Sequence, residues 1–183
     1  MEKSEDVVWD VPLADIFSDD EFNCRGKVAP IDVLDLAQSI AKLGLQQPII
    51  LQEFAEHPPH KFRIVCGHRR FKACSINKMP SIKAIVRKGL SYDDALILNL
   101  SENLKRSDLN IMQEAFAIDK FRKNKWTPNN IAEQLNVSRS WVKIRFLLLG
   151  LPEEIQAAAA GGIVSQQQIM DISNLPTKEL KYE

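Results

Sequence analysis

The sequence has few of the features that mark secreted, disulfide-bonded or membrane-spanning proteins. It holds three cysteines in 183 residues, and no two are spaced as a CxxC pair. An odd number without this spacing argues against a disulfide framework and a zinc site, and favours a reducing, cytosolic setting. A run of about 18 apolar residues, which could span a membrane, is missing, and the acidic start is unlike a signal peptide. We therefore expect a cytoplasmic protein without membrane contact.

Net charge is lacking too, but the balance hides two basic segments. The formal charge is zero at pH 7, yet residues 57–92 contain nine lysines and arginines and no acidic residue. Residues 105–145 contain nine basic and four acidic side chains, while residues 1–21 are strongly acidic. Separated basic segments favour binding to a polyanion. Solvated surface lysines are the alternative for either segment alone.

Hydrophobic periodicity predicts an α+β part followed by an all-α part. The first part is expected to contain an extended entry at 8–16, a helix at 31–43, a hairpin of strands at 48–51 and 62–66, a short helix at 69–77, a strand at 82–86 and a helix at 95–104. Gly44 is the predicted stop of the first helix, and Ser91 the predicted cap of the last. Only helical patterns follow, so we expect domains at 1–104 and 105–183.

The turn after the second hairpin strand combines residues that suit phosphate binding. It reads Gly67-His68-Arg69-Arg70. A glycine lets the backbone approach an anion, a helix N-terminus offers N–H groups, and guanidinium groups bind oxygens in pairs. Together with the acid–amide pair Glu102-Asn103 downstream, this turn is the predicted nucleotide contact. The alternatives are arginines lying along a surface helix and a Glu102 paired with Lys105.

The helical part carries a second informative stretch. A helix from about residue 129 to 135 is predicted to end at Asn136, which tolerates a left-handed backbone. Ser138 then caps a helix with Val142, Phe146 and Leu149 on one face. This is the pattern of a helix-turn-helix, in which the first residues of the second helix face the major groove. The residues expected there are Ser138, Arg139, Ser140 and Lys143. The alternative is a plain αα-hairpin in a helical bundle.

With these stretches in hand, the chain resembles the ParB/Spo0J family of plasmid and chromosome partition proteins along nearly its whole length. Residues 44–49 are similar to the family's GxxQPI segment and residues 67–73 to its GERRxRA box. Residues 102–109 are similar to its ENLQRxDL box, and residues 127–154 to its helix-turn-helix with the following LPEE. The resemblance implies an α+β domain of the ParB/sulfiredoxin fold followed by an all-α helix-turn-helix domain.

The resemblance also implies ligands and partners. It implies CTP with Mg²⁺, double-stranded DNA with a palindromic, centromere-like site, and a dimer acting as a nucleotide-gated clamp on a plasmid, phage or chromosome. A ParA-type ATPase is a further expected partner. The nucleotide residues implied are Arg25, Gln47, Gly67, His68, Arg69, Arg70, Glu102 and Asn103, of which Glu102 and Asn103 would also serve the metal. The DNA residues implied are Lys105, Arg106, Ser138, Arg139, Ser140 and Lys143.

The sequence departs from the family pattern at several points. His68 stands where the family has a glutamate tied to metal handling and hydrolysis, so weak CTPase activity stays open. His68 itself has three interpretations: structural, phosphate-facing or catalytic. Cys66 precedes Gly67, so the chain reads Cys-Gly-His-Arg at this point. This is close to the Gly-Cys-His-Arg of sulfiredoxin, but the cysteine stands one position earlier. No C-terminal dimerisation domain is expected after Tyr182. A transcription regulator with a vestigial nucleotide pocket is the alternative function, and an enzyme is less favoured.

Overall fold

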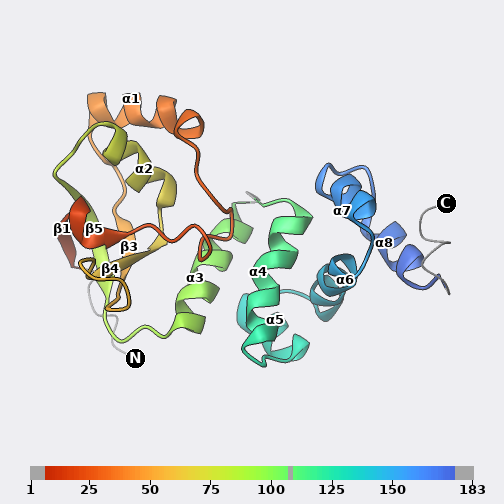
Figure 1. The fold of residues 1–183 in the computed structure, drawn as a ribbon. Coiled ribbons are helices and arrows are strands. Elements are labelled where there is room, and N and C mark those ends of the chain that lie inside the picture. The colour runs from red at the N-terminus through yellow and green to blue at the C-terminus, as the bar shows by residue number, and fades with distance from the viewer. Residues whose placement is uncertain (1–6, 107–108, 176–183) are drawn as a thin grey trace. The chain divides into compact units, whose positions relative to one another are not determined.

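The computed structural model describes residues 7–106 and 109–175. The chain forms two compact units, Met1–Asn99 and Leu100–Glu183. The first unit combines a mixed sheet with helices, and the second is helical, which confirms the expected fold class (Figure 1). The division falls within helix α3, Tyr92–Lys105, so the domain boundary at residue 104 stays a prediction.

A five-stranded sheet with the order β1-β5-β3-β4-β2 forms the centre of the first unit. Its strands are β1 Val8–Pro12, β2 Ile16–Phe17, β3 Ile49–Glu53, β4 Phe62–Cys66 and β5 Ser81–Arg87. The predicted β3–β4 hairpin is confirmed as an antiparallel pair. The β3–β5 and β2–β4 pairs are parallel, and the edge strand β1 runs antiparallel to β5.

Helices cover both faces of this sheet (Figure 1). A 3₁₀ turn, η2 Pro30–Val33, leads into α1 Leu34–Leu43, and α2 spans His68–Ile76. Apolar side chains of α1 and α2 pack with those of β3, β4 and β5 in one core cluster. The opposite face meets the start of α3, where the Tyr92 ring centre lies 4.9 Å from the Arg63 guanidinium of β4. The predicted helix at 31–43 thus begins as a 3₁₀ turn and continues as α1 from Leu34.

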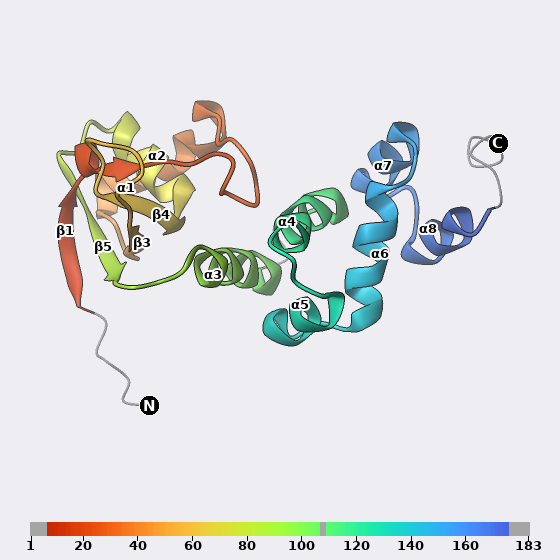
Figure 2. The same cartoon turned by 60° about the horizontal axis from the view of Figure 1, so that its bottom comes forward.

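Besides the end of α3, the second unit contains five helices in its described part. They are α4 Ile111–Lys123, α5 Pro128–Leu135, α6 Arg139–Leu149, α7 Glu153–Ala160 and α8 Gln166–Ser173 (Figure 2). Met112, Ile144, Leu148, Leu151, Ala159 and Ile169 form one of its core clusters. None of the helices in residues 7–106 and 109–175 is long and apolar enough to cross a membrane.

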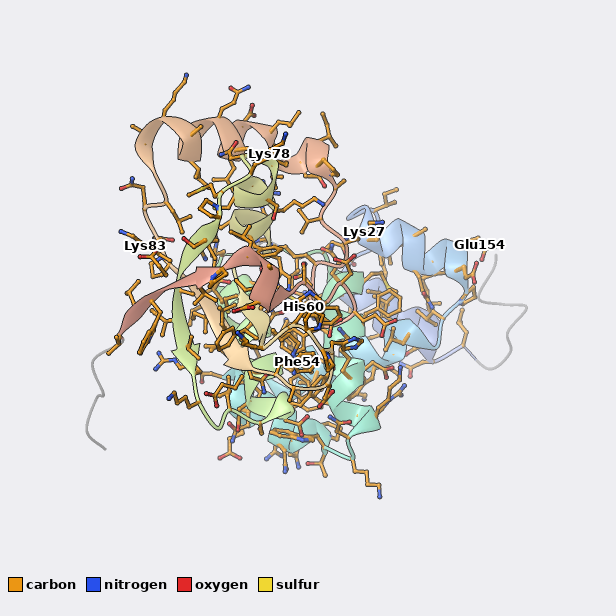
Figure 3. The ribbon with its side chains drawn as sticks, turned by 60° about the vertical axis from the view of Figure 1, so that its left-hand side comes forward. Lys27, Phe54, His60, Lys78, Lys83 and Glu154 are labelled. Atoms are coloured by element: carbon orange, nitrogen blue, oxygen red, sulfur yellow. The ribbon has the colours of Figure 1, made fainter. Side chains whose placement is uncertain are left out.

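Two arginines that the sequence counts within its basic segments, Arg63 and Arg145, are buried. The Arg63 guanidinium lies 4.5 to 4.9 Å from the ring centres of Phe22, Phe54 and Tyr92 and donates to Gln52 Oε1 at 2.9 Å. This arginine therefore belongs to the interior, where Phe54 lies among packed side chains (Figure 3). Lys78 and Lys83, labelled in the same view, remain on the surface. The basic surface is smaller than the sequence indicates.

Candidate nucleotide site and DNA-binding helices

The turn that begins α2 is built on a glycine that no other residue replaces without strain. Gly67 caps α2 with φ 103° and ψ 26°, in the left-handed region. A Cβ atom at this position would lie 2.6 Å from Ile49 Cγ2 and 3.0 Å from Ile49 Cβ. The backbone thus packs directly on β3 while the first turn of α2 follows. N–H groups in the first turn of a helix have no intrahelical acceptor, which makes this end suitable for an anion.

The two arginines of the turn hold the loops on either side of it. Arg70 Nη1 donates to the carbonyl oxygens of Gln47 at 3.1 Å and Pro48 at 2.6 Å. Arg69 Nη2 donates to the carbonyl oxygen of Asp32 at 2.8 Å. Arg69 is exposed and Arg70 half-buried. Because a guanidinium group carries five N–H donors, each can hold a carbonyl and still bind phosphate. The structure therefore brings Gln47, Gly67 and Arg70 together, while Arg69 extends toward Asp32. That these residues hold a nucleotide stays a prediction.

The loop that carries Arg25 is fixed to the same end of the sheet by Asn99. The Asn99 side chain accepts from Cys24 N at 3.2 Å and donates to the Val65 carbonyl at 2.6 Å. Asn99 is fully buried, so both of its hydrogen bonds form away from water. Sequence reasoning missed this residue. The one available signal is an amide within an otherwise apolar stretch of α3, which needs a partner when buried.

His68 is buried directly behind the turn. It is 6% exposed, and its Nε2 has no hydrogen-bond partner among residues 7–106 and 109–175. Burial lowers the pKa of His68 to about 4, although the charge of Asp19 opposes the shift. The imidazole is therefore neutral near pH 7. A buried neutral ring fits the structural interpretation of His68, and it differs in charge from the glutamate of the family pattern.

The predicted metal and phosphate residues of the second box lie at the end of α3, in the second unit. Asn103 is buried and Glu102 is half-buried, with its Oε1 3.6 Å from Arg106 Nη1. Lys105, the alternative partner of Glu102, is exposed, and the ion pair of Glu102 is formed with Arg106, four positions along the helix. Their expected meeting with the Gly67 turn stays a prediction. Within the described ranges, no group of three His, Cys, Asp or Glu residues is placed to hold a metal.

Helices α5 and α6 form the predicted helix-turn-helix. The Thr127 side chain caps α5 by accepting from Asn130 N at 3.2 Å, and Ser138 caps α6 by accepting from Trp141 N at 3.0 Å. Asn136 joins them with φ 53° and ψ 46°, in the predicted left-handed conformation. Ala132 is buried between the helices, and the Val137 N–H donates to its carbonyl oxygen at 2.9 Å.

The buried and exposed faces of α6 are well separated. Val142, Ile144, Arg145 and Leu148 are buried. Of the predicted apolar face, Val142 is buried, while Phe146 and Leu149 are half-buried and Leu149 packs against the helical core. Arg139, Ser140 and Lys143 are exposed and line one groove. The helix thus presents these three predicted DNA residues on one side, while the Ser138 hydroxyl is engaged as a cap.

A buried ion pair anchors α6 to its neighbours. Arg145 Nε and Nη2 donate to Glu114 Oε2 of α4 at 2.9 and 2.6 Å, and Nη1 lies 3.3 Å from Gln166 Oε1 of α8. The guanidinium also stacks 4.1 Å from the ring centre of Trp141. Burial lowers the pKa of Arg145, and the hydrogen bond that Arg145 donates to Glu114 opposes this shift. Arg145 is therefore a structural residue rather than a DNA contact.

A mixed α/β domain with a cationic strand-to-helix turn, followed by a helix-turn-helix unit, defines the class of protein. The sequence model of the ParB N-terminal domain matches residues 1–104, and that of the ParB HTH domain matches residues 107–183. The chain belongs to the ParB family of chromosome-partitioning proteins.

Relatives and solved structures agree with this assignment. The probable chromosome-partitioning protein ParB of Rickettsia conorii is 34% identical over 146 residues, covering 78% of this chain and 47% of that protein. The chain thus spans about half the length of the curated relatives it matches. C-terminally truncated ParB of Caulobacter crescentus complexed to the centromeric parS site has a TM-score of 0.66 at 25% identity, covering 94% and 88% of the two chains. The Caulobacter complex with CTP-γ-S has a TM-score of 0.50 at 26% identity, covering 97% and 99%.

Proposed function

We propose that this chain is a CTP-dependent DNA-binding protein that acts as a clamp on a centromere-like site in the partition of a chromosome, plasmid or phage. The observation that carries the proposal is the presence of two cationic sites in one chain. One is the glycine–arginine turn that begins α2, and the other is the exposed face of α6. Similarity over nearly the whole chain to relatives complexed with parS and with CTP-γ-S supports both halves.

In the nucleotide half, the Gly67 turn binds the triphosphate. Its close-packed glycine and the first turn of α2 supply backbone N–H groups, and Arg69 and Arg70 supply guanidinium donors. Arg25, on the loop fixed by Asn99, reaches the phosphates, and Gln47 lies beside the base or ribose. His68 packs behind the turn.

Glu102 and Asn103 are assigned to the Mg²⁺ ion that accompanies the nucleotide phosphates. Mg²⁺ prefers oxygen ligands and is usually held by one or two carboxylates together with substrate phosphates. Such a site needs no dedicated cluster of three protein carboxylates. Because His68 replaces the family glutamate, we assign binding of CTP to this chain and leave its hydrolysis unassigned.

In the DNA half, α6 enters the major groove with Arg139, Ser140 and Lys143 toward the bases and phosphates. Lys105 and Arg106 provide further phosphate contacts. A palindromic site would be bound by two copies, and a ParA-type ATPase would be the motor partner. Both associations are proposed from the resemblance to the family.

The direct test is calorimetric titration of the four ribonucleoside triphosphates, with Mg²⁺, into the chain. CTP is expected to bind and the other three to bind weakly or not at all. Arg70→Ala should abolish CTP binding, while Lys83→Ala, which removes an exposed cation from β5, should not. Because Arg70 also holds two carbonyl groups, thermal melting of each variant must show that it is folded. Absence of CTP binding by the unmodified chain would contradict the nucleotide half.

A transcription regulator with a vestigial nucleotide pocket is the second candidate. The observation that favours it is the buried, neutral His68 together with arginines that already bind backbone carbonyls. In that case a gel shift with cognate DNA would be the same with and without CTP, and the chain would repress a nearby promoter. A CTP-dependent gel shift would reject this candidate.

A further inference from the structure

A groove lies between the start of α5 and the exposed side of α6. It has a volume of about 440 Å³ and is lined by Pro128, Arg139, Ser140, Lys143, Phe146 and Leu147. Residues 139, 143 and 147 recur every four positions, so they share one helix face. The groove therefore includes the three exposed polar residues already assigned to DNA and three apolar ones with no assigned role.

The groove has a cationic rim and an apolar floor. Arg139 and Lys143 are exposed, whereas Phe146 and Leu147 are half-buried. The sequence contains no acidic residue between Glu133 and Glu153, so nothing along α6 offsets the positive rim. A ligand that suits this groove has negative charges that meet the cationic rim and an apolar group that contacts the floor.

The floor is held in place by a neighbouring helix. The Arg122 guanidinium of α4 lies 5.2 Å from the centre of the Phe146 ring, and Arg122 is itself paired with Asp119 at 2.5 Å. This contact restricts the ring. An aromatic side chain fixed in this way presents a constant surface to whatever enters the groove.

One strand of duplex DNA carries both required features. Its phosphates are anionic, and the apolar group on its major-groove edge is the C5 methyl of thymine, which small apolar and aromatic side chains contact. We propose that Phe146 and Leu147 read thymine methyl groups in the groove, while Arg139 and Lys143 bind the flanking phosphates or purine edges. This inference rests on the proposed DNA binding by α6. It adds that base selection there depends on apolar contacts as well as hydrogen bonds.

The test begins with a duplex selected from a random library by the full chain. Each thymine of the selected site is then replaced by deoxyuridine, which removes one methyl group and leaves all base-pair hydrogen bonds. We expect at least one such replacement to weaken binding about fourfold, the effect of burying one methyl-sized group. Because the change is in the DNA, it cannot unfold the protein.

Protein variants then assign the effect to the groove. For each thymine whose methyl group matters, the deoxyuridine replacement should no longer weaken binding in Leu147→Ala or in Phe146→Leu, whichever variant removes the side chain that contacts that methyl group. In Lys143→Ala, both duplexes should bind more weakly and the difference between them should persist. Circular dichroism and melting of each variant exclude unfolding.

The other outcomes contradict the inference in distinguishable ways. If the selected duplex binds and no deoxyuridine replacement weakens it, or if the site contains no thymine, the inference is wrong while DNA binding stands. If the effect persists in both apolar variants, the methyl group is read elsewhere. If the chain selects no duplex at all, the proposed DNA-binding function fails first.

Discussion

Gly67 determines whether the turn that begins α2 can form, because it combines a left-handed backbone with direct packing on Ile49. Gly67→Ala would place a methyl group 2.6 Å from Ile49 Cγ2. We expect a loss of about 2–4 kcal/mol in unfolding free energy, from the backbone cost and from overpacking, measured by urea denaturation. Gly89→Ala is the matched control, because Gly89 has φ +65° but open space around it. It should lose only about 1 kcal/mol. Equal losses would refute the packing role of Gly67.

His68 makes stability depend on pH at the same turn. Its pKa falls from 6.5 in the unfolded chain to about 4 in the folded protein, so the unfolded state binds more protons between these values. The His68 contribution is therefore complete above about pH 6.5 and is lost as the pH falls toward about 4, amounting to about 3 kcal/mol. Urea denaturation of the wild type and His68→Gln across this range measures it. Parallel pH profiles of the two proteins would exclude a buried neutral imidazole.

At the scale of helices, the Arg145–Glu114 pair joins α6 to α4. Removing one partner leaves an uncompensated buried charge, so Arg145→Met and Glu114→Leu should each lower the unfolding free energy by about 3–5 kcal/mol. The double variant should regain most of this loss, because apolar groups replace both charges. Chemical denaturation of the four proteins gives the coupling. Additive losses would mean that the two side chains act independently.

The sequence predicted helix caps and turns correctly where the preference of a single residue determines the local backbone conformation. Ser91, Ser138 and Asn136 stand at the caps and the turn that their side chains or conformations favour, and the β3–β4 hairpin follows from its alternating strands. These effects act within a few positions along the chain, so one sequence is enough to find them.

The contacts that complete the candidate site could not be predicted in the same way. Asn99 binds Cys24, 75 positions away, and Val65, 34 positions away. Arg63 is surrounded by rings from three separate segments, although its charge and its neighbours in sequence indicate a surface residue. Such contacts depend on how the sheet and helices meet, and neither composition nor periodicity contains that information.

On the scale of the whole molecule, the proposed function assigns some basic residues to CTP and others to DNA. Lys105 and Arg106 are assigned to DNA phosphates, although they follow the box implied for the nucleotide. Replacing both by alanine should reduce the slope of log affinity against log salt by about 1.8, near 0.9 for each phosphate contact. Fluorescence anisotropy over a range of salt concentrations measures the slope. An unchanged slope with weakened CTP binding would assign the pair to the nucleotide.

The most direct test of a nucleotide-dependent DNA clamp is the CTP affinity of the full chain in the presence of its selected duplex and of a scrambled duplex. Coupling between two sites is reciprocal, so a chain whose DNA binding depends on CTP must bind CTP differently when the cognate DNA is present. We predict a change of about 5- to 150-fold between the two duplexes, the usual range for coupled sites. Equal CTP affinity with both duplexes would show that the two sites act independently, and would contradict the account.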